Sequence, residues 1–437
     1  MKYYSTNKQA PLASLKRAVI KGLAGDKGLY MPENIDLLKD FVIGEMKDMT
    51  FQEIACTVAD TLFGDDVDGN TLEGIVKETL AFDTPVVPVH DNIYSLELFH
   101  GPTLAFKDVG ARFMARLLKY FIAKEGVKDV NVLVATSGDT GSAVANGFLG
   151  VDGIKVYVLY PKGKVSTIQE CQFTTLGQNI TALEIDGTFD DCQALVKSAF
   201  MDTEIGEHMK LTSANSINVA RFLPQSFYYF YAYAQLDKLG KADELVISVP
   251  SGNFGNITAG IVAYWMGLPI KRFIAANNRN DVFLDYLNTG VYVPQPSIAT
   301  IANAMDVGDP SNFARIMDLF SIYPDPYKAI KKRILGYAYT NEDIADTLRQ
   351  VYSRYGYVLD PHGACGYQGL IDNKLTERET GLFLETAHPA KFKDTVDKIL
   401  GIDQEIPSKL QAFMNGEKQS VELGKDFEGF RKYLLSL

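Results

Sequence analysis

Three segments of this 437-residue chain carry groups that could bind an anion or react with a carbonyl compound. The first is the glycine-rich turn SGNFGN at 251–256, which leads from an expected strand into an apolar helix at 257–265. Such a turn exposes backbone N–H groups, and the positive helix terminus adds to their attraction for phosphate. It matches neither the Walker A pattern nor GxGxxG, so a nucleotide site is not indicated. A structural turn that simply needs small residues is the alternative. The residues that we interpret as a phosphate-binding loop are Gly252, Asn253, Phe254, Gly255 and Asn256.

A second loop of the same kind, TSGDTG at 136–141, lies between an expected strand and a helix that begins near its end. Its hydroxyl groups and exposed amides could bind another anion, such as a substrate carboxylate. In doubly wound sheets the ligand crevice lies at the carboxyl ends of the strands, so two such loops can face one ligand. The residues that we expect to take part are Ser137, Gly138, Asp139, Thr140 and Gly141.

The third segment contains Lys107, which has Ala105 and Phe106 before it and Val109 close after it. Apolar surroundings disfavour the charged form of a lysine, and an uncharged amine is the form that makes a Schiff base. The neighbouring Asp108 permits a different interpretation, an ordinary surface ion pair. The residues alone leave both interpretations open.

The bulk properties exclude several classes of protein. A formal net charge of -11 argues against nucleic-acid binding, which requires a basic face. The first ten residues lack the apolar run of a secretory signal, and no later stretch is apolar enough to predict a membrane span. The four cysteines are far apart and form no CxxC pair, so we expect free thiols, no metal site and a cytoplasmic location.

Short runs rich in β-branched residues alternate with helical patterns in the middle of the chain, which indicates a doubly wound α/β architecture with parallel strands. The runs are almost entirely apolar, as expected for strands covered on both faces. Between them, 188–200 predicts an amphipathic helix that Thr188 caps. The expected strands are 130–136, 155–160, 179–185, 245–249 and 272–275.

The regions on either side of this α/β core show a different pattern. The chain after Pro294 is mainly helical; its clearest helix is 341–355, which we expect Asn341 to cap and Gly356 to end. A strand at 381–386 is expected to return to the core sheet, and the tail after residue 402 carries only a charged helical pattern. The expected domains are a small N-terminal domain at 1–95, an α/β core at 96–300 with a subdomain at about 130–235, and a helical part at 301–437.

Taken together, ordered motifs along most of the chain resemble the threonine synthases, within the β-family of pyridoxal-phosphate enzymes that includes the tryptophan synthase β chain. The resemblance implies two doubly wound, mostly parallel sheets of fold type II and an additional small N-terminal domain. The motifs are GLYMPE at 28–33, HGPTLAFKD at 100–108, TSGDTGSA at 136–143, PKGKVSTIQECQ at 161–172, NSINVAR at 215–221, SGNFGN at 251–256 and ETAHPAKF at 385–392.

The resemblance implies a carbon–oxygen lyase of threonine biosynthesis that forms threonine and phosphate from O-phosphohomoserine and water, by γ-elimination and β-addition on pyridoxal 5'-phosphate. Lys107 would link the cofactor and act as the base, the loop at 252–256 would hold the cofactor phosphate, and Thr386 would contact the ring nitrogen. The loop at 137–141 would receive the substrate carboxylate. Asp139 departs from the asparagine that many relatives outside this subgroup carry, which puts a contact with the cofactor hydroxyl in question.

The leaving phosphate requires a second anion site, for which the motifs at 161–172 and 215–221 supply cations and short polar donors. A planar guanidinium matches two phosphate oxygens, so Arg221 is the foremost candidate, although a helix-surface position would also account for it. The candidates are Lys162, Lys164, Ser166, Asn218 and Arg221.

Two alternatives stay open at this point. A serine or threonine dehydratase-like lyase of the same fold would share the lysine, the glycine loop and Thr386, and a non-catalytic phosphometabolite-binding relative would share the fold alone. We expect a small-molecule substrate, no nucleic-acid or membrane partner, and a monomer or homodimer.

Overall fold

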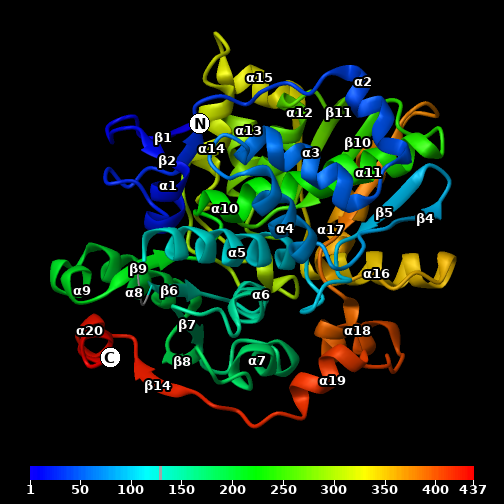
Figure 1. Ribbon diagram of the computed structural model, residues 1–437. Coiled ribbons are helices and arrows are strands. Elements are labelled where there is room, and N and C mark those ends of the chain that lie inside the picture. The colour runs from blue at the N-terminus through cyan, green and yellow to red at the C-terminus, as the bar shows by residue number, and fades with distance from the viewer. Residues whose placement is uncertain (127–129) are drawn as a thin grey trace. The chain divides into compact units, whose positions relative to one another are not determined.

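The structure is a computed structural model that describes residues 1–126 and 130–437. The chain forms two compact units, each assembled from segments that are distant in sequence (Figure 1). The first unit contains Met1–Tyr30, Lys107–Arg221 and Ile406–Leu437. The second contains Met31–Phe106 and Phe222–Glu405.

The first unit is built on a parallel sheet with the strand order β14-β8-β7-β6-β9. The strands are β6 (Val130–Ala135), β7 (Ile154–Pro161), β8 (Ile180–Asp186), β9 (Lys210–Ser213) and β14 (Val421–Gly424). The helices are α1 (Leu15–Lys21), α5 (Lys107–Glu125), α6 (Asp139–Phe148), α7 (Thr167–Thr174), α8 (Phe189–Met201), α9 (Thr203–His208), α19 (Ser408–Met414) and α20 (Phe427–Leu435). Buried side chains of α8 and α20 pack with those of β6, β7 and β8 in one hydrophobic cluster.

A small N-terminal sheet has the order β2-β1-β3 and consists of β1 (Lys2–Ser5), β2 (Ala13–Ser14) and β3 (Tyr30–Pro32). The chain passes from one unit to the other at four points, of which one falls within β3 and one within the short helix α10 (Val219–Phe222).

The second unit is built on a sheet with the order β12-β11-β10-β13-β5-β4, parallel except for the edge strand β4. The strands are β4 (Val86–His90), β5 (Ile93–Glu97), β10 (Leu245–Pro250), β11 (Ile270–Asn277), β12 (Ile334–Ala338) and β13 (Thr380–Glu385). The α-helices are α2 (Asp40–Glu45), α3 (Phe51–Phe63), α4 (Gly69–Thr79), α11 (Ser226–Lys238), α12 (Gly255–Trp265), α13 (Val282–Thr289), α14 (Phe313–Phe320), α15 (Pro326–Arg333), α16 (Asn341–Tyr355), α17 (Pro361–Asn373) and α18 (Lys393–Leu400). The 3-10 turns are η1 (Met46–Asp48), η2 (Leu223–Gln225), η3 (Asn303–Met305) and η4 (Pro389–Phe392).

Helices cover both faces of this second sheet. Gly260 of α12 lies against Phe273 of β11, whereas Gly369 of α17 lies against Ile274, the next residue of the same strand. Because successive side chains of a strand point to opposite faces, α12 and α17 lie on opposite sides of the sheet. The central strands β10, β11 and β13 are therefore buried on both faces, which explains their continuous apolar sequences.

The predicted fold class is confirmed, and each predicted strand corresponds to an observed one within a few residues. Thr188 caps α8 by accepting a hydrogen bond from the Asp191 amide, and Gly356 ends α16 in the left-handed conformation. The prediction that Asn341 caps α16 is wrong. Thr340 is the cap, because its hydroxyl accepts from the Asp343 amide while the Asp343 side chain bonds back to the Thr340 amide.

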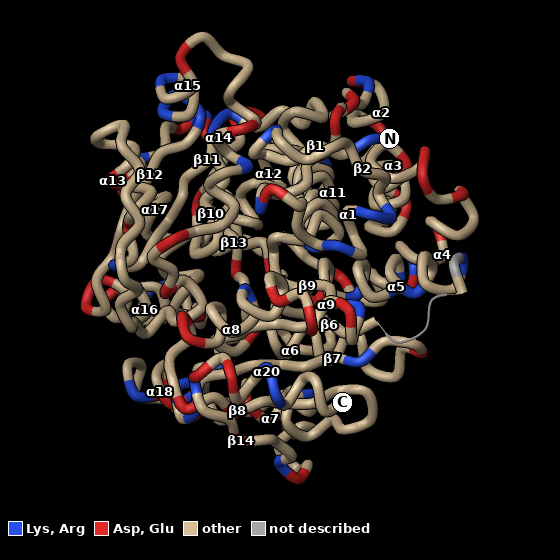
Figure 2. The backbone as a smooth tube through the Cα atoms, turned by 90° about the vertical axis from the view of Figure 1, so that its left-hand side faces the viewer, with Lys and Arg blue, Asp and Glu red and all other residues tan. Residues whose placement is uncertain are grey.

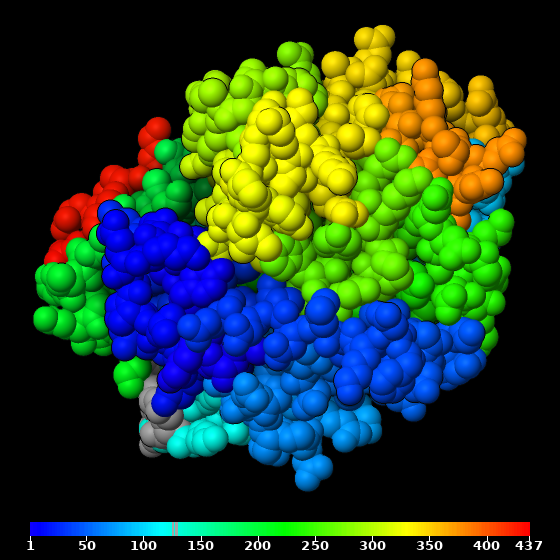
Figure 3. Space-filling view, turned by 90° about the horizontal axis from the view of Figure 1, so that it is seen from above, coloured from blue at the N-terminus to red at the C-terminus, as the bar shows by residue number. Residues whose placement is uncertain are grey.

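The surface of the second unit carries the exposed turn 321–324 and α15, which lie within the yellow region of Figure 3. Basic residues gather on α15, whereas elsewhere Figure 2 shows acidic and basic residues interspersed along the chain. Within the described residues, no helix combines the length and apolar character needed to cross a membrane.

Two helical glycines test how closely the elements of each unit pack. A Cβ atom at Gly110 of α5 would lie 2.3 Å from the Arg221 carbonyl oxygen, whereas one at Gly74 of α4 would have no neighbour within 4 Å. We expect Gly110→Ala to lower the free energy of unfolding by about 2–3 kcal/mol through overpacking. Gly74→Ala should raise it by about 0.5–1 kcal/mol, because alanine costs less backbone entropy in a helix. Urea unfolding of both variants checks this, and effects of the same sign would contradict it.

Candidate functional site

The phosphate-loop candidate and Thr386 emerge at the same edge of the second unit's sheet. β10 runs parallel to β13, with Ser248 opposite Phe383, so the two strands end side by side. The loop 251–256 follows β10 directly, and Thr386 follows β13 directly. The structure therefore brings together two of the predicted cofactor contacts.

The loop 251–256 has the geometry of an anion site. Phe254 caps α12 with a left-handed backbone (φ 60°), and the helix begins at Gly255. The first-turn amides of Gly255, Asn256 and Ile257 therefore have no acceptor within the helix. A Cβ atom at Gly252 would lie 2.7 Å from Met305 Cα, so this position tolerates no side chain.

A second layer of residues fixes the loop from behind. Asn253 accepts a hydrogen bond from the Ser311 amide at its Oδ1 (2.6 Å) and one from Asn312 Nδ2 at its carbonyl oxygen (2.9 Å). Asn312 in turn accepts from the Nη1 of Arg315 (2.7 Å). Arg315 is fully buried, and burial lowers its pKa to about 9. A cationic side chain thus stands two hydrogen bonds behind the loop.

The backbone around Thr386 is paired with the segment that precedes Lys107. Phe106 donates its amide hydrogen to the Thr386 carbonyl oxygen (2.9 Å), and Ala105 forms an antiparallel bridge with Ala387. Lys107 is the next residue along the chain and the first residue of α5. This pairing fixes the backbone of the two residues that directly precede Lys107.

Two titratable groups lie close to Thr386 in sequence, and burial disfavours the charged form of both. Glu385 is fully buried, and burial together with the charge of Asp360 raises its pKa well above the ordinary value. Burial, followed by the charge of His100, lowers the pKa of His388 to about 4. The His388 Nδ1 accepts the Ala390 amide (3.1 Å). Burial therefore works against a charge on either of these sequence neighbours of Thr386.

In the first unit, three adjacent parallel strands end at the predicted substrate segments. The loop 136–141 follows β6, residues 162–166 follow β7, and residues 214–221 follow β9. The Thr136 hydroxyl accepts the amides of Gly138 (2.9 Å) and Gly141 (2.7 Å). Two of the amides that we expected to bind an anion are therefore already bonded, so the expected carboxylate site rests on Ser137 and Thr140.

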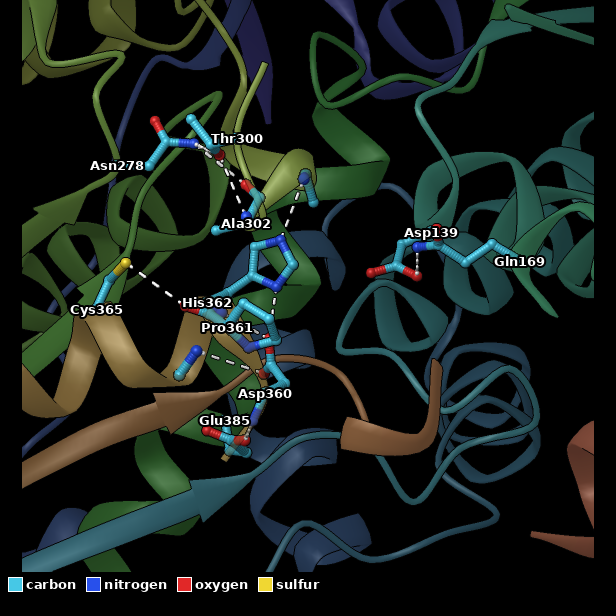
Figure 4. Close-up of polar contacts among 12 residues, drawn as sticks. Asp139, Gln169, Asn278, Thr300, Ala302, Asp360, Pro361, His362, Cys365 and Glu385 are labelled. Carbon is cyan, nitrogen blue, oxygen red and sulfur yellow. Dashed lines mark hydrogen bonds and ion pairs between the residues drawn. The ribbon is translucent and has the colours of Figure 1, made fainter. Parts of the chain in front are cut away.

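Gln169 of α7 joins two of these segments, and the sequence reasoning missed it. Its Nε2 donates to Asp139 Oδ1 (2.8 Å), as Figure 4 shows, and Ser166 donates to its Oε1 (3.0 Å). A Cβ atom at Gly138 would lie 2.6 Å from the same side chain. The motif at 161–172 contains this glutamine, but a lone glutamine in a helix resembles a surface residue. Asp139 is thus engaged inside the unit.

The residues that we expect to bind the substrate phosphate differ in whether their donor groups already bond other residues. The Asn218 amide donates to the carbonyl oxygens of Val19 (2.9 Å) and Ser213 (3.1 Å), so both its hydrogens hold the unit together. Lys162 forms an exposed ion pair with Glu422 of β14 (2.8 Å), while Lys164 is exposed at the end of β7.

Arg221 is buried rather than on a helix surface. Its Nη1 donates to the Ala214 carbonyl oxygen, and only 3 % of the residue is exposed. Burial lowers its pKa to about 10, against the opposing charge of Asp108. The guanidinium therefore keeps its charge at pH 7 in a position next to the start of α5.

Comparison with known proteins identifies the class. Residues 78–384 match the family described as pyridoxal-phosphate dependent enzyme. The chain belongs to that class. Residues 2–80 match the threonine synthase N terminus, and residues 363–434 match the threonine synthase C-terminal region.

Full-length relatives define the family within the class. The chain is 45 % identical to threonine synthase of Haemophilus influenzae over 100 % of both chains. Its fold matches the crystal structure of threonine synthase from Escherichia coli with a TM-score of 0.93, 43 % identity and full coverage of both chains. It also matches the PLP-bound threonine synthase from Brucella melitensis with a TM-score of 0.92 and 35 % identity, over 100 % of this chain and 99 % of that one. The chain therefore belongs to the threonine synthase family.

The residues present fit pyridoxal phosphate. The cofactor phosphate is a dianion, and the start of α12 offers amide donors that have no acceptor within the helix. Because Gly252 has no side chain, the backbone of the loop can lie directly against η3. Thr386 has a neutral hydroxyl group of the kind that could bond the ring nitrogen. Within the described ranges, no group of three or more His, Cys, Asp or Glu side chains is arranged to hold a metal ion.

The depressed pKa of His388 predicts a pH-dependent stability. The ring stays neutral to about pH 4 in the folded protein, whereas the unfolded chain takes up a proton near pH 6.5. Between these values the unfolded state binds more protons, so stability falls as the pH falls, by on the order of 2 kcal/mol between pH 7 and pH 5. His388→Asn keeps an acceptor for the Ala390 amide and should remove this loss. Denaturant unfolding at pH 7 and pH 5 measures it, and an equal loss in both proteins would contradict the expectation.

Proposed function

We propose that this chain converts O-phospho-L-homoserine and water into L-threonine and inorganic phosphate. The observation that supports this best is that the two terminal regions, 2–80 and 363–434, match regions particular to threonine synthases and not only the part shared by pyridoxal-phosphate enzymes. A dehydratase-like activity would have no need for a second phosphate site. The proposal therefore depends on both the cofactor loop and the strand ends of the first unit.

The bound cofactor withdraws electrons from the substrate carbon that carries the amine. We propose that the amides of residues 252–256 bind its phosphate and that the Thr386 hydroxyl bonds its ring nitrogen. A hydroxyl partner leaves that nitrogen largely unprotonated, whereas an aspartate would keep it protonated. The pKa shifts of Glu385 and His388 support the same arrangement, because burial disfavours the negative charge of the first and the positive charge of the second. Such surroundings favour elimination and replacement over transamination.

Lys107 is proposed to anchor the cofactor covalently and then to act as the base. Its Nζ takes the proton from the substrate Cα and later one from Cβ, after which phosphate leaves from Cγ. Protonation at Cγ, addition of water at Cβ and return of a proton to Cα complete threonine. Atoms balance: one water enters and one phosphate leaves.

The substrate is proposed to be held by residues at the strand ends of the first unit. Ser137 and Thr140 supply hydroxyl donors for the carboxylate, on the backbone formed by Gly138, Asp139 and Gly141. Lys164 contacts the phosphate and buried Arg221 adds positive charge. Ser166 joins them by turning its hydroxyl hydrogen from Gln169 Oε1 to the phosphate. We assign Asn218 a supporting role, because its amide hydrogens already hold Val19 and Ser213.

The setting in the cell is part of the proposal. The cysteines are free thiols, which favours the reducing cytoplasm. We further propose that the chain acts as a monomer or a homodimer, which sedimentation analysis distinguishes.

The first test concerns Lys107. We expect the protein with pyridoxal phosphate to develop a visible absorption band and to release threonine and phosphate from O-phosphohomoserine. Lys107→Ala should lose the band and nearly all turnover, because no other amine is proposed to take its place. Release of a 2-oxo acid from serine or threonine in place of threonine formation would favour the dehydratase-like alternative. A protein that stays colourless would overturn the assignment.

The second test compares two neighbouring lysines. Lys164→Ala should raise the KM for O-phosphohomoserine about tenfold or more, as expected for loss of a charged hydrogen bond. Lys162→Ala is the matched control, because Lys162 is paired with Glu422 and should change KM little. Steady-state kinetics on both variants decides. Equal effects would remove Lys164 from the phosphate site.

A further inference from the structure

An aspartate–histidine pair lies buried at the start of α17, outside every role proposed above. Asp360 is the helix cap: it accepts the amide of His362 (2.7 Å) and that of Gly363 (3.4 Å). The same carboxylate contacts the His362 Nδ1, as Figure 4 shows. Asp360 is fully buried and only 2 % of His362 is exposed. A buried imidazole held in this way has a fixed orientation.

The second ring nitrogen of His362 reaches a distant turn. Its Nε2 accepts the backbone amide of Ala304 in η3 (3.1 Å). A neutral imidazole can accept at one nitrogen only if the other carries the proton. Because a carboxylate can only accept at Nδ1, Asp360 selects the tautomer in which Nε2 is the acceptor. Asp360 therefore keeps His362 in the form that can accept the Ala304 amide hydrogen.

The turn that His362 holds lies directly on the phosphate loop. A Cβ atom at Gly252 would meet Met305 Cα at 2.7 Å and the Ala304 carbonyl oxygen at 2.8 Å. On its other side the turn is held by Asn278, which follows β11 and donates to the Ala302 carbonyl oxygen (3.2 Å) and to Asp306 (2.8 Å). The position of Gly252 thus depends on a turn clamped between α17 and the end of β11.

We propose that His362 is a positioning residue for the cofactor phosphate: it fixes the turn 303–305 against Gly252 and so sets the backbone of the phosphate loop. This inference rests on the proposed role of that loop. Asp360 extends the same arrangement to the other end of the site, because its amide donates to the Glu385 carboxyl group one residue before Thr386. One buried pair consequently supports both the phosphate loop and the strand end that carries Thr386.

The test is His362→Phe, which keeps a ring against Phe392 (centroids 5.0 Å apart in the parent) and removes the acceptor for Ala304. We expect the dissociation constant for pyridoxal phosphate, measured by titrating apoprotein, to rise about tenfold for the loss of one buried hydrogen bond. The phosphorus-31 resonance of the bound cofactor should shift or broaden. A purely structural effect would lower stability without moving that resonance.

Two further comparisons keep the result interpretable. His362→Gln offers an oxygen that can reach the Ala304 amide and should restore most of the affinity, whereas the shorter His362→Asn should not. Cys365→Ala, in the same buried helix, should lower the melting temperature but leave cofactor affinity unchanged. If His362→Phe does not fold, the Gln and Asn pair carries the test.

The outcomes separate this inference from the proposed function. If the parent protein shows no absorption band with pyridoxal phosphate, both fail together. If the parent binds the cofactor and the His362 variants bind it equally well with an unchanged phosphorus resonance, the positioning role alone is overturned. Loss of affinity in Cys365→Ala equal to that in His362→Phe would also overturn it.

Discussion

The parallel pairing of β10 with β11 on one side and β13 on the other is the constraint on which the second unit depends. Parallel strands must be joined by crossovers that cover the sheet, so their carboxyl ends gather at a single edge. The loop 251–256, Thr386 and Asn278 all follow strands that end there. The same rule governs β7, β6 and β9 in the first unit. The loops that we propose to bind anions arise in both units from one backbone requirement.

Burial in turn determines which charges these edges can hold. Removing an ionised carboxylate from water costs more than most hydrogen bonds return, so burial raises the pKa of Glu385, and burial also lowers the pKa of His388 to about 4. Arg315 is equally buried but keeps its charge, since guanidinium is a far stronger base, and it donates to Asn312 behind the phosphate loop. The second unit therefore places a positive charge behind 251–256 and disfavours a charge on the side chains of Glu385 and His388. That division suits a cofactor with an anionic phosphate and a neutral ring nitrogen.

Local sequence patterns predict six strands, β6, β7, β8, β10, β11 and β13, because apolar runs and glycine-rich turns act over a few residues. They failed where two residues compete for one local role, as Thr340 and Asn341 do for the cap of α16. The edge strand β14 was also missed, because its alternating exposure resembles a charged helix. Contacts of Gln169 with Asp139 and of His362 with Ala304 join residues 30 and 58 positions apart, which no local pattern contains.

The motif at 215–221 shows that a suitable residue type does not by itself make a phosphate ligand, because the position in the fold decides which donors are available. Asn218 and Arg221 were both selected as polar donors that suit a phosphate, yet the first uses its amide hydrogens to hold Val19 and Ser213. Arg221 donates a hydrogen bond to the Ala214 carbonyl oxygen. It lies near Asp108 and packs against Gly110 of α5. An anchored guanidinium loses little side-chain entropy when it meets an anion, whereas exposed Lys164 must be ordered first. A phosphate site built from Arg221 and Lys164 would combine a charge in a fixed position with a side chain that can move. Phosphate could then leave while Arg221 stays in place.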